Sequence, residues 1–423
     1  MKLRVGPYQW TGRELNGALG DLGVLLPLEA ALIAINGLNP TTTLLGVGII
    51  YILSGFYFRI PMPVQPLKAL SALAIAHHSP PGVIAAAALL MAGFLFALSA
   101  TRGIKLLEKI VPIPVVRGVQ IGLGFLLLKS AYQMVFLKPF LLSGQKAHVN
   151  VASLAIPGGV LLGLVSVVLL FVLLRLKSIP AALVVAAVGI VTALFTLGGD
   201  AVWRIGPAPL NLSLPSAGDF WPALVLLVVP QLPLTLANSV IATADAAKAY
   251  FGGKAERATP TRIAMSIALG NLWAGLTGGL PNCHGCGGLT AHYRLGARTP
   301  LATAFLGVML IGVALLFGRS AMEIRSLLPA ATLGVLLFYV GVQHIILGVN
   351  VDSTVQLALA AVVAVVSMAF GGNLAVGAAA GLAVYWGARL VARKGRWQPA
   401  VASPQKPAFK RVVAALERVV PSA

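Results

Sequence analysis

Pro61-Met-Pro-Val-Gln-Pro-Leu-Lys68 and Gly278-Gly-Leu-Pro-Asn-Cys-His-Gly285 precede two short apolar stretches, about 66–76 and about 286–293, and these interruptions decide the predicted fold. Each stretch is too short to cross a bilayer, because a spanning helix needs roughly 20 residues. Backbone that leaves the helical form at membrane depth must find hydrogen-bond partners in protein or in cavity water. We therefore expect the two extended segments to pair with each other as short strands, each followed by a half-helix.

The rest of the chain is apolar enough to be embedded in a membrane. Of its 423 residues, 58% are apolar and only 10% are charged, against roughly 25% charged in ordinary soluble domains. This composition leaves no room for a sizeable soluble catalytic domain. A window of about 20 residues predicts full spans near 13–35, 41–58, 82–101, 112–136, 157–175, 179–197, 221–247, 261–279, 300–318, 329–347, 354–370 and 373–391.

The two half-helices occupy corresponding places, third in each half of the chain, and bring the total to fourteen segments. Because seven is odd, the second half must enter the membrane in the opposite direction, which is the inverted repeat of secondary transporters. We therefore predict an all-α polytopic membrane protein with a 7+7 inverted repeat and half-helices at segments 3 and 10. The predicted divisions are a first repeat at 1–215, a second at 216–396 and a short basic tail at 397–423.

The distribution of basic residues predicts the orientation and explains most of the net charge of +20. Cytoplasmic loops of membrane proteins carry an excess of Lys and Arg. With the N-terminus inside, the fourteen segments leave only five cations outside, namely Lys138, Lys146, Arg204, Arg319 and Arg325. We expect a multi-pass protein of the plasma or inner membrane with both termini in the cytoplasm, and no nucleic-acid partner. Within the tail, residues 409–420 fit either a basic amphipathic helix on an anionic leaflet or a solvated end.

The first turns of the half-helices are predicted to form an anion site. A helix N-terminus offers free N–H groups and the positive end of a dipole, near Pro66 to Lys68 in one repeat and near Gly285 to Gly288 in the other. Lys68 adds a full positive charge, although it could instead pair with an internal acid or extend to an interface. Two such ends that face each other favour a small anion.

Several motifs resemble one known family. Gly20-Asp-Leu-Gly23, the Pro61–Lys68 stretch, Pro230-Gln-Leu-Pro-Leu-Thr-Leu-Ala-Asn-Ser239 and Pro281-Asn-Cys-His-Gly-Cys-Gly-Gly-Leu-Thr290 are similar to those of the MOT-type molybdate transporters, which are relatives of the SulP sulfate permeases. The resemblance implies the seven-plus-seven fold of uracil permeases and anion exchangers, and uptake of an oxyanion. It also implies a core domain that moves against a gate domain. We expect segments 1–4 and 8–11 in the core and segments 5–7 and 12–14 in the gate, which in related folds is a common dimer interface.

A second group of candidates lies on the predicted eighth span. Gln231, Thr235 and Asn238 form a polar stripe at helical spacing, which either contacts a ligand or holds helices together. A tetrahedral dianion needs many donors and few carboxylates nearby. The predicted substrate-binding set therefore comprises Gln65, Pro66, Lys68, Gln231, Asn238, Asn282, His284, Gly285, Cys286 and Gly287. His77, His78, His148, His292 and His344 are assigned no role.

Import of a dianion against 100 mV costs about 4.6 kcal/mol, so we expect coupling to another ion, most simply a proton. Candidate proton carriers are the carboxylates Asp21, Glu29 and Asp245. Asp21 could alternatively serve as a partner of Lys68 or as a cap for nearby backbone. The predicted function is proton-coupled import of molybdate.

Three alternatives stay open. Sulfate is also a tetrahedral dianion and could be the substrate, and an anion channel of the same fold would have a similar site. Cys283 and Cys286 have the spacing of zinc and redox sites, so a membrane redox or metal enzyme is the third alternative. We expect no metal, no cofactor and no enzyme activity, because no second ligand cluster accompanies the two cysteines.

Overall fold

The computed structural model describes most of the chain. The described residues are 3–5, 7–101, 103, 104, 110, 112–140, 148–151, 154–175, 181–196, 204–210, 214–324, 329–351 and 353–393. The predicted tail at 397–423 lies outside them.

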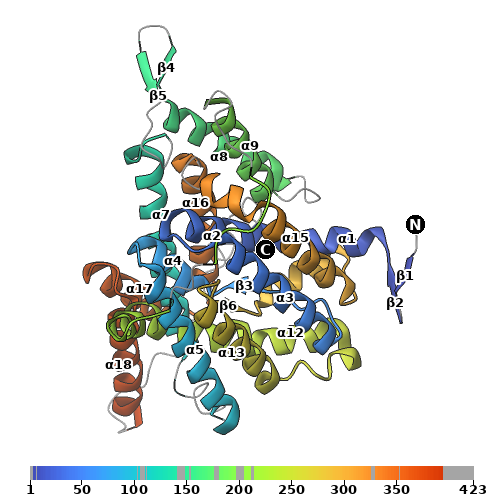
Figure 1. Cartoon of the computed structure of the whole chain (residues 1–423). Helices are drawn as coiled ribbons and strands as arrows, with labels where there is room; N and C mark the ends of the chain where they lie inside the picture. Colours follow the sequence, from blue (N-terminus) through green and yellow to red (C-terminus); the bar gives the residue numbers. More distant parts are fainter. Residues whose placement is uncertain are drawn as a thin grey trace.

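The first half contains two small hairpins and a series of helices (Figure 1). In chain order its elements are β1 (Leu3–Val5), β2 (Tyr8–Trp10), α1 (Gly12–Leu19), α2 (Leu22–Asn36), α3 (Pro40–Phe58), β3 (Gln65–Pro66), α4 (Lys68–Ala76), α5 (Pro81–Thr101), α7 (Ile113–Tyr132) with its π-helical extension η1 (Gln133–Leu137), β4 (His148–Val151), β5 (Leu154–Pro157), α8 (Gly158–Arg175) and α9 (Ala181–Thr196).

The second half begins with a long helical stretch of changing pitch, in which α and π turns follow one another. It comprises η2 (Ala217–Asp219), α10 (Phe220–Pro222), η3 (Ala223–Val228), α11 (Val229–Leu234), η4 (Thr235–Ile241), α12 (Ala242–Phe251) and η5 (Gly252–Ala255). The remaining elements are α13 (Pro260–Thr277), β6 (Asn282–Cys283), α14 (Cys286–Leu295), α15 (Leu301–Ile324), α16 (Ala330–Val349), α17 (Thr354–Ala369) and α18 (Leu374–Arg393).

Eight helices among the described residues are long and apolar enough to cross a membrane. They are Pro40–Phe58, Pro81–Thr101, Ile113–Leu137, Gly158–Arg175, Ala217–Ala255, Leu301–Ala321, Ala330–Val349 and Leu374–Val391. Shorter apolar helices cover Leu25–Asn36 and Thr354–Ala369. The protein is therefore a helical, polytopic membrane protein, and its helix bounds lie within a few residues of most predicted spans.

The predicted first span differs in one respect, because it is divided into α1 and α2 at Gly20 and Asp21. The side chain of Asp21 does not cap α2. It is fully buried and accepts hydrogen bonds from Tyr51 and Gln65 instead. The sequence window detected only the apolar character of the stretch and not this break.

The two half-helices begin where two short strands cross. β3 pairs antiparallel with β6, with Gln65 opposite Cys283 and Pro66 opposite Asn282. The Leu67 amide extends the pairing and donates to the carbonyl of Pro281 at 3.0 Å. β3 and β6 lie near the middle of the molecule in Figure 1, and along the chain α4 follows β3 and α14 follows β6. The pairing satisfies backbone groups that a half-helix would otherwise leave exposed at this depth.

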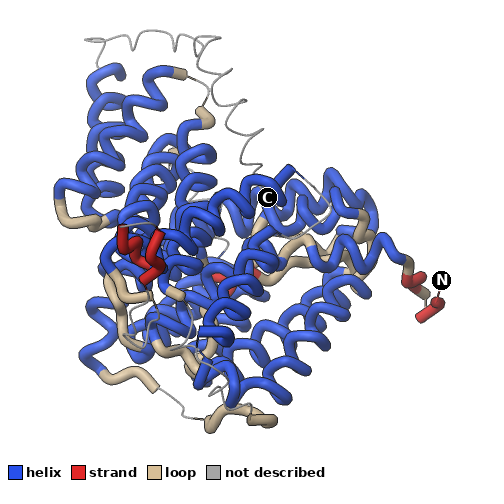
Figure 2. Tube along the Cα trace, turned by 90° about the horizontal axis from the view of Figure 1, so that it is seen from above, coloured by secondary structure: helices blue, strands red, loops and turns tan. Residues whose placement is uncertain are grey.

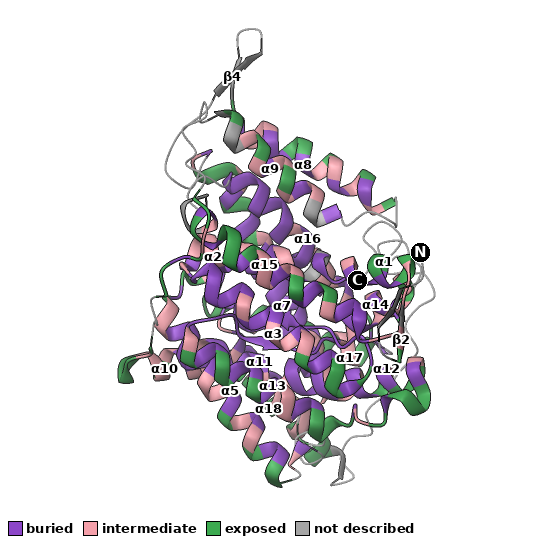
Figure 3. Ribbon diagram, turned by 45° about the vertical axis from the view of Figure 1, so that its right-hand side comes forward, coloured by how far each residue is buried: buried purple, intermediate pink, exposed green. Residues whose placement is uncertain are grey.

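Long helices pack in pairs that join the two halves of the chain. α3 packs along α15 and α5 along α13, while α7 packs along both α16 and α17. Glycines permit the closest approaches, since a Cβ at Gly307 would lie 2.5 Å from the carbonyl oxygen of Gly48, and one at Gly124 would lie 2.7 Å from that of Gly341. Such small residues are typical of helix contacts inside membranes. The tube view in Figure 2 shows the helical bundle from a second side, and Figure 3 shows that much of its interior is buried.

Candidate functional site

Two adjoining cavities lie beside the first turns of the half-helices. A cavity of about 20 Å³ is lined by Lys68, Gln120, Gln231, Leu234, Asn238, Ser239, Cys283, His344 and Leu347. A larger one of about 280 Å³ shares Lys68, Asn238, His344 and Leu347, and it extends past Cys286 and Gly287 to the exposed Arg294. The described residues that line these cavities include two full cations, Lys68 and Arg294, and no carboxylate. The electrostatics therefore favour an anion.

The N-terminus of α4 determines the position of Lys68. It is the first residue of the helix, directly after Leu67 at the N-cap, and it is half-buried. One turn later, the amide of Leu70 donates to the side-chain Oε1 of Gln231 at 2.9 Å. Gln231 thus ties the first turn of α4 to α11 and fixes the position from which Lys68 reaches both cavities.

The first turn of α14 forms another wall of the larger cavity. Cys286 and Gly287 line this cavity, and the first amides of any α-helix lack partners within the helix. Leu289 donates its amide to the carbonyl of Gly285 at 3.2 Å, so the helical bonding starts there. Gly287 brings no side chain that would cover the backbone. The arrangement presents N–H groups and the positive end of a helix dipole toward the cavity.

Gln231 and Asn238, two residues of the predicted polar stripe, line the small cavity, and Gln231 also forms hydrogen bonds within the protein. Its Oε1 accepts from Leu70, and its Nε2 donates to the hydroxyl of Thr235 at 2.9 Å. A primary amide has two N–H donors, so one remains for a ligand. Asn238 is half-buried and lines both cavities.

The side chains of Gln65, Asn282 and His284 are absent from the described lining of both cavities. Gln65 donates to Asp21, and Asn282 donates to the carbonyls of Gly270 and Leu280 at 3.2 and 3.0 Å. The Nδ1 of His284 lies 2.8 Å from the carbonyl oxygen of Pro63, and its Nε2 lies 2.8 Å from the Ser266 hydroxyl. These side chains hold the strand crossing to its neighbours. Pro66 and Gly285 flank the half-helices outside the same lining.

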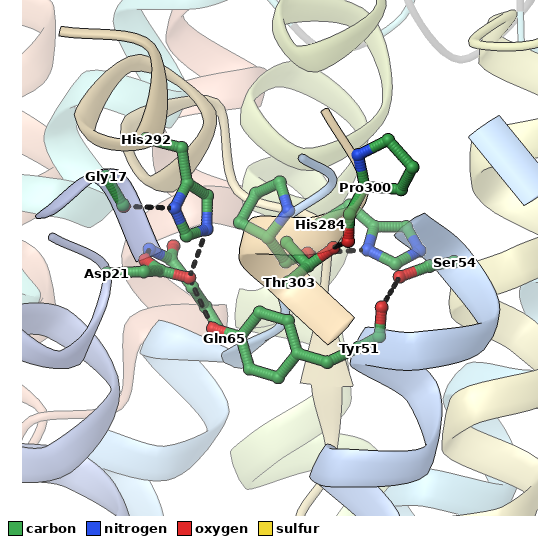
Figure 4. Close-up of polar contacts among 10 residues, drawn as sticks. Gly17, Asp21, Tyr51, Ser54, Gln65, His284, His292, Pro300 and Thr303 are labelled. Carbon is green, nitrogen blue, oxygen red and sulfur yellow. Dashed lines mark hydrogen bonds and ion pairs between the residues drawn. The ribbon is translucent and has the colours of Figure 1, made fainter. Parts of the chain in front are cut away.

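Asp21 is the centre of a buried polar cluster (Figure 4). Its carboxylate accepts from the hydroxyl of Tyr51 at 2.5 Å and from Gln65, and it lies 3.6 Å from the Nε2 of His292. The Nδ1 of His292 lies 2.7 Å from the carbonyl oxygen of Gly17 and therefore carries a hydrogen. Because Nδ1 carries the hydrogen, the Nε2 of a neutral His292 has only a lone pair to offer the carboxylate of Asp21. The contact between them is favourable when the Asp21–His292 pair holds one further proton.

The other two predicted proton carriers have contrasting surroundings. Glu29 is 2% exposed, and neither of its carboxylate oxygens has a hydrogen-bond partner among the described residues. A buried carboxylate without partners is costly as an anion. Asp245 lies at an exposed position in the first turn of α12.

Sequence reasoning missed several cavity residues. His344 on α16 and Gln120 on α7 line the small cavity, and Tyr250, Thr290 and Arg294 line the larger one. Gln120 and His344 are polar residues within apolar spans, which was the available signal. Among the described residues, no group of three or more His, Cys, Asp or Glu side chains could hold a metal. Both cysteines are free thiols, one buried and one partly buried.

Comparison with known proteins connects this geometry to a family. The family described as "Molybdate transporter of MFS superfamily" matches residues 13–127 and 223–343. Molybdate transporter 2 of Arabidopsis thaliana is 32% identical over 415 residues, covering 88% of this chain and 86% of that protein. Molybdate transporter 1 of Chlamydomonas reinhardtii is 31% identical over 434 residues, covering 79% of this chain and 83% of that protein. These relatives are transporters and not enzymes.

Solved structures share the fold at lower identity. The transmembrane domain of a cyanobacterial bicarbonate transporter, BicA, has a TM-score of 0.63 and 21% identity, covering 86% of this chain and 97% of that one. Murine solute carrier 26 family member A9, an anion transporter in its inward-facing state, has a TM-score of 0.65 and 15% identity, covering 92% and 70%. The sequence matches span both halves of the chain and include the strand crossing and the first turns of both half-helices. The chain belongs to the molybdate transporter family.

Proposed function

We propose that the protein is a secondary active transporter that imports molybdate by alternating access. The observation that carries the proposal is the position of Lys68, which begins one half-helix and lines the same cavity as the first turn of the other. The relatives named as molybdate transporters and the fold shared with anion transporters support an anionic substrate. Lys68, the amides of Cys286 and Gly287, and the free N–H donors of Gln231 and Asn238 would bind the oxyanion.

We further propose fourteen membrane segments in a 7+7 inverted repeat, with repeats at 1–215 and 216–396. The helix pairs support the repeat, because segment 2 packs along segment 11 and segment 4 along segment 9, which are exchanged by swapping the halves. The family match in two stretches, one in each half, agrees with it. The core would contain segments 1–4 and 8–11, and the gate segments 5–7 and 12–14.

Proton coupling would involve the buried acids. Import of a dianion against 100 mV costs about 4.6 kcal/mol, and Asp21 with His292 forms a buried pair suited to hold one proton. Glu29 is the second candidate because its carboxyl group is buried without partners among the described residues. Asp245 is the weakest, since it lies at an exposed position and not inside the protein. Coupling by Asp21 predicts that import accelerates when the outside is acidic.

We also propose residence in the plasma or inner membrane with both termini in the cytoplasm, on the basis of the basic loops. A homodimer formed through the gate would match the dimers that are common in related folds.

Sulfate transport is the principal alternative function, because sulfate and molybdate have the same charge and shape and differ in size. An anion channel of the same fold is less favoured, because passive flow does not require a proton carrier such as the buried Asp21–His292 pair.

The test is binding of molybdate, tungstate, sulfate and uracil by the purified protein at matched ionic strength. Lys68→Ala and Gln231→Ala are compared with Lys129→Ala and Gln133→Ala, which change the same residue types at exposed positions. We expect tight molybdate and tungstate binding that only the first two variants lose. Preference for sulfate would change the substrate and keep the site. Binding of uracil alone, or binding that neither Lys68→Ala nor Gln231→Ala weakens, would overturn the anion site.

Channel and transporter are separated in proteoliposomes by imposing a proton gradient. Accumulation of molybdate above equilibrium identifies a coupled transporter. Flux that only follows the molybdate gradient identifies a channel.

A further inference from the structure

An apolar groove runs between α3 and α13 on the surface of the bundle. Its volume is about 490 Å³, and its walls include Ile50 and Leu53 on α3 and Met265, Leu269 and Trp273 on α13. Leu53 is 64% exposed and Leu269 is 55% exposed. Exposed apolar side chains on two spanning helices face hydrocarbon in a membrane, so the groove has the character of an acyl-chain site.

One end of this groove is basic. Arg262 lines the groove in the first turn of α13, where the positive end of the helix dipole adds to its charge. Tyr57 lines it as well, and the carbonyl of Tyr57 accepts from Arg257 at 3.1 Å. The guanidinium carbon of Arg257 also lies 5.6 Å from the centre of the Tyr57 ring. Tyr57 and Arg257 therefore join the groove to the neighbouring pocket.

That neighbouring pocket has a volume of about 340 Å³, and its described lining holds four cations and one carboxylate. The cations are Arg59, Lys254, Arg257 and Arg298, and the carboxylate is Glu256. Arg298 is engaged, because it donates to backbone carbonyls and covers the Tyr293 ring at 3.7 Å.

Among the residues that the structure describes, three cations at this end lack a counter-ion. Within the described residues, the side chains of Arg59, Lys254 and Arg262 form no ion pair, and all three residues are exposed. Arg59 also ends α3 at a φ of 61°, a left-handed conformation that usually selects glycine at a helix end. An arginine at such a position points to a use for its charge.

We propose that this site binds an anionic phospholipid, with an acyl chain in the α3–α13 groove and the phosphate on Arg257, Arg262 and Arg59. Guanidinium groups match phosphate oxygens in pairs. A free phosphate would use only the basic pocket, whereas a phospholipid uses the pocket and the adjoining groove. The basic end is also the proposed cytoplasmic end, where anionic lipids attract basic residues.

The proposed lipid site is linked to the strand crossing through a hydrogen bond between Ser266 and His284. Ser266 lines the groove, and its hydroxyl bonds the Nε2 of His284 at 2.8 Å. The opposite ring nitrogen of His284 donates to Pro63, just before β3. An occupied groove would therefore support α13 at the point where it holds the loops that carry both strands.

The experiment measures thermal unfolding and retained lipid, the latter by native mass spectrometry, for purified protein with phosphatidylglycerol or phosphatidylcholine added at equal mole fraction. The test variant is Arg257→Gln with Arg262→Gln, and the control is Arg319→Gln with Arg389→Gln, which removes the same charge elsewhere. We expect phosphatidylglycerol to stabilise the wild type and the control, and the test variant to need about tenfold more of it. Equal responses of the two double variants would overturn the site.

Two further arms identify the source of the phosphate and test the groove. Inorganic phosphate and glycerol 3-phosphate, at matched ionic strength, should not reproduce the effect, and if they do, the pocket binds a soluble anion and the lipid proposal is wrong. Met265→Trp should fill the groove and weaken the response with the arginines intact, while an unchanged response would place the acyl chain elsewhere. Gel filtration and unfolding without added lipid show that each variant is folded.

Discussion

Replacing Gly288 with alanine should disrupt the contact between Asp21 and Gln65. Gly288 lies in the first turn of α14, and a Cβ there would be 2.5 Å from the Oδ1 of Asp21, 2.5 Å from the Nε2 of Gln65 and 2.7 Å from the Cβ of Pro63. Ordinary contacts begin near 3.4 Å. The carboxylate and the amide must both retreat, and the hydrogen bond between them cannot survive unchanged.

The expected cost follows from three effects. Loss of a hydrogen bond to a charged group costs about 1.5–3 kcal/mol, and overpacking of a filled interior adds about 1–3 kcal/mol. Alanine recovers roughly 0.8–1 kcal/mol relative to glycine within a helix. The net destabilisation of Gly288→Ala is therefore about 1.5–5 kcal/mol.

Unfolding titrations with sodium dodecyl sulfate would measure this cost. The control is Gly312→Ala in α15, where an added Cβ meets nothing within 4 Å, and we expect it to be neutral or slightly stabilising. In a Gln65→Ala background, Gly288→Ala should cost less, because one of the two clashing polar groups is gone. If Gly288→Ala unfolds at the same detergent fraction as the wild type, the first turn of α14 does not lie against Asp21 and the cluster is wrongly described.

The other predictions concern coupling, helix packing and the thiols. Asp21→Asn should keep molybdate binding within a fewfold and abolish uptake driven by an imposed proton gradient, and proteoliposome uptake that is still proton-driven would exclude Asp21 as the carrier. Gly341→Val should force α7 and α16 apart, because a Cβ there already lies 3.0 Å from the carbonyl oxygen of Gly124. It should cost about 1–3 kcal/mol in the same titration, and a wild-type midpoint would contradict the close packing. Cys283→Ala with Cys286→Ala should still bind molybdate, measured by calorimetry, and complete loss of binding would restore the redox or metal interpretation.

The helices could be predicted because the length of each apolar stretch, and the residues that interrupt it, can be read from the sequence. The Pro-rich and Gly-rich stretches before Lys68 and Cys286 indicated where helices start inside the membrane, and the structure begins α4 and α14 at these residues. The break at Asp21 was not predicted, and the side chain of Asp21 there contacts Tyr51 and Gln65 on other elements, which no local pattern shows.

Polar residues near the site were harder to assign to a ligand or to the protein. Gln65, Asn282 and His284 were expected to face the anion, but each of their side chains bonds a carboxylate, carbonyl or hydroxyl of the fold. Amide and imidazole groups at an interruption are equally suited to both tasks, and spacing along the chain does not distinguish them. His344 received no role, yet it lines both cavities. The position of His344 at the cavities depends on how α16 packs against elements of the first half of the chain, and no local sequence pattern predicts that packing.

The cavity is built from parts that the proposed mechanism would move against each other. Lys68 is fixed to the proposed core, because Gln231 holds the first turn of α4 and β6 holds the strand before it. Gln120 and His344 line the same cavity from α7 and α16 of the proposed gate. The Nδ1 of His344 lies 2.8 Å from the carbonyl oxygen of Val340, so only its Nε2 is available to the cavity.

A neutral His344 would therefore present a lone pair to an anion, and only the protonated ring would donate a hydrogen bond. An oxyanion held by Lys68 and the half-helix amides would therefore bind the core whatever the proton supply. On the gate side, the amide of Gln120 could donate without a proton, whereas His344 would donate only when protonated. Sliding of the core would break the gate contact and leave the core contacts intact. Under the proposed mechanism, such a division would let the anion travel with the core while a proton on His344 strengthens its contact with the gate.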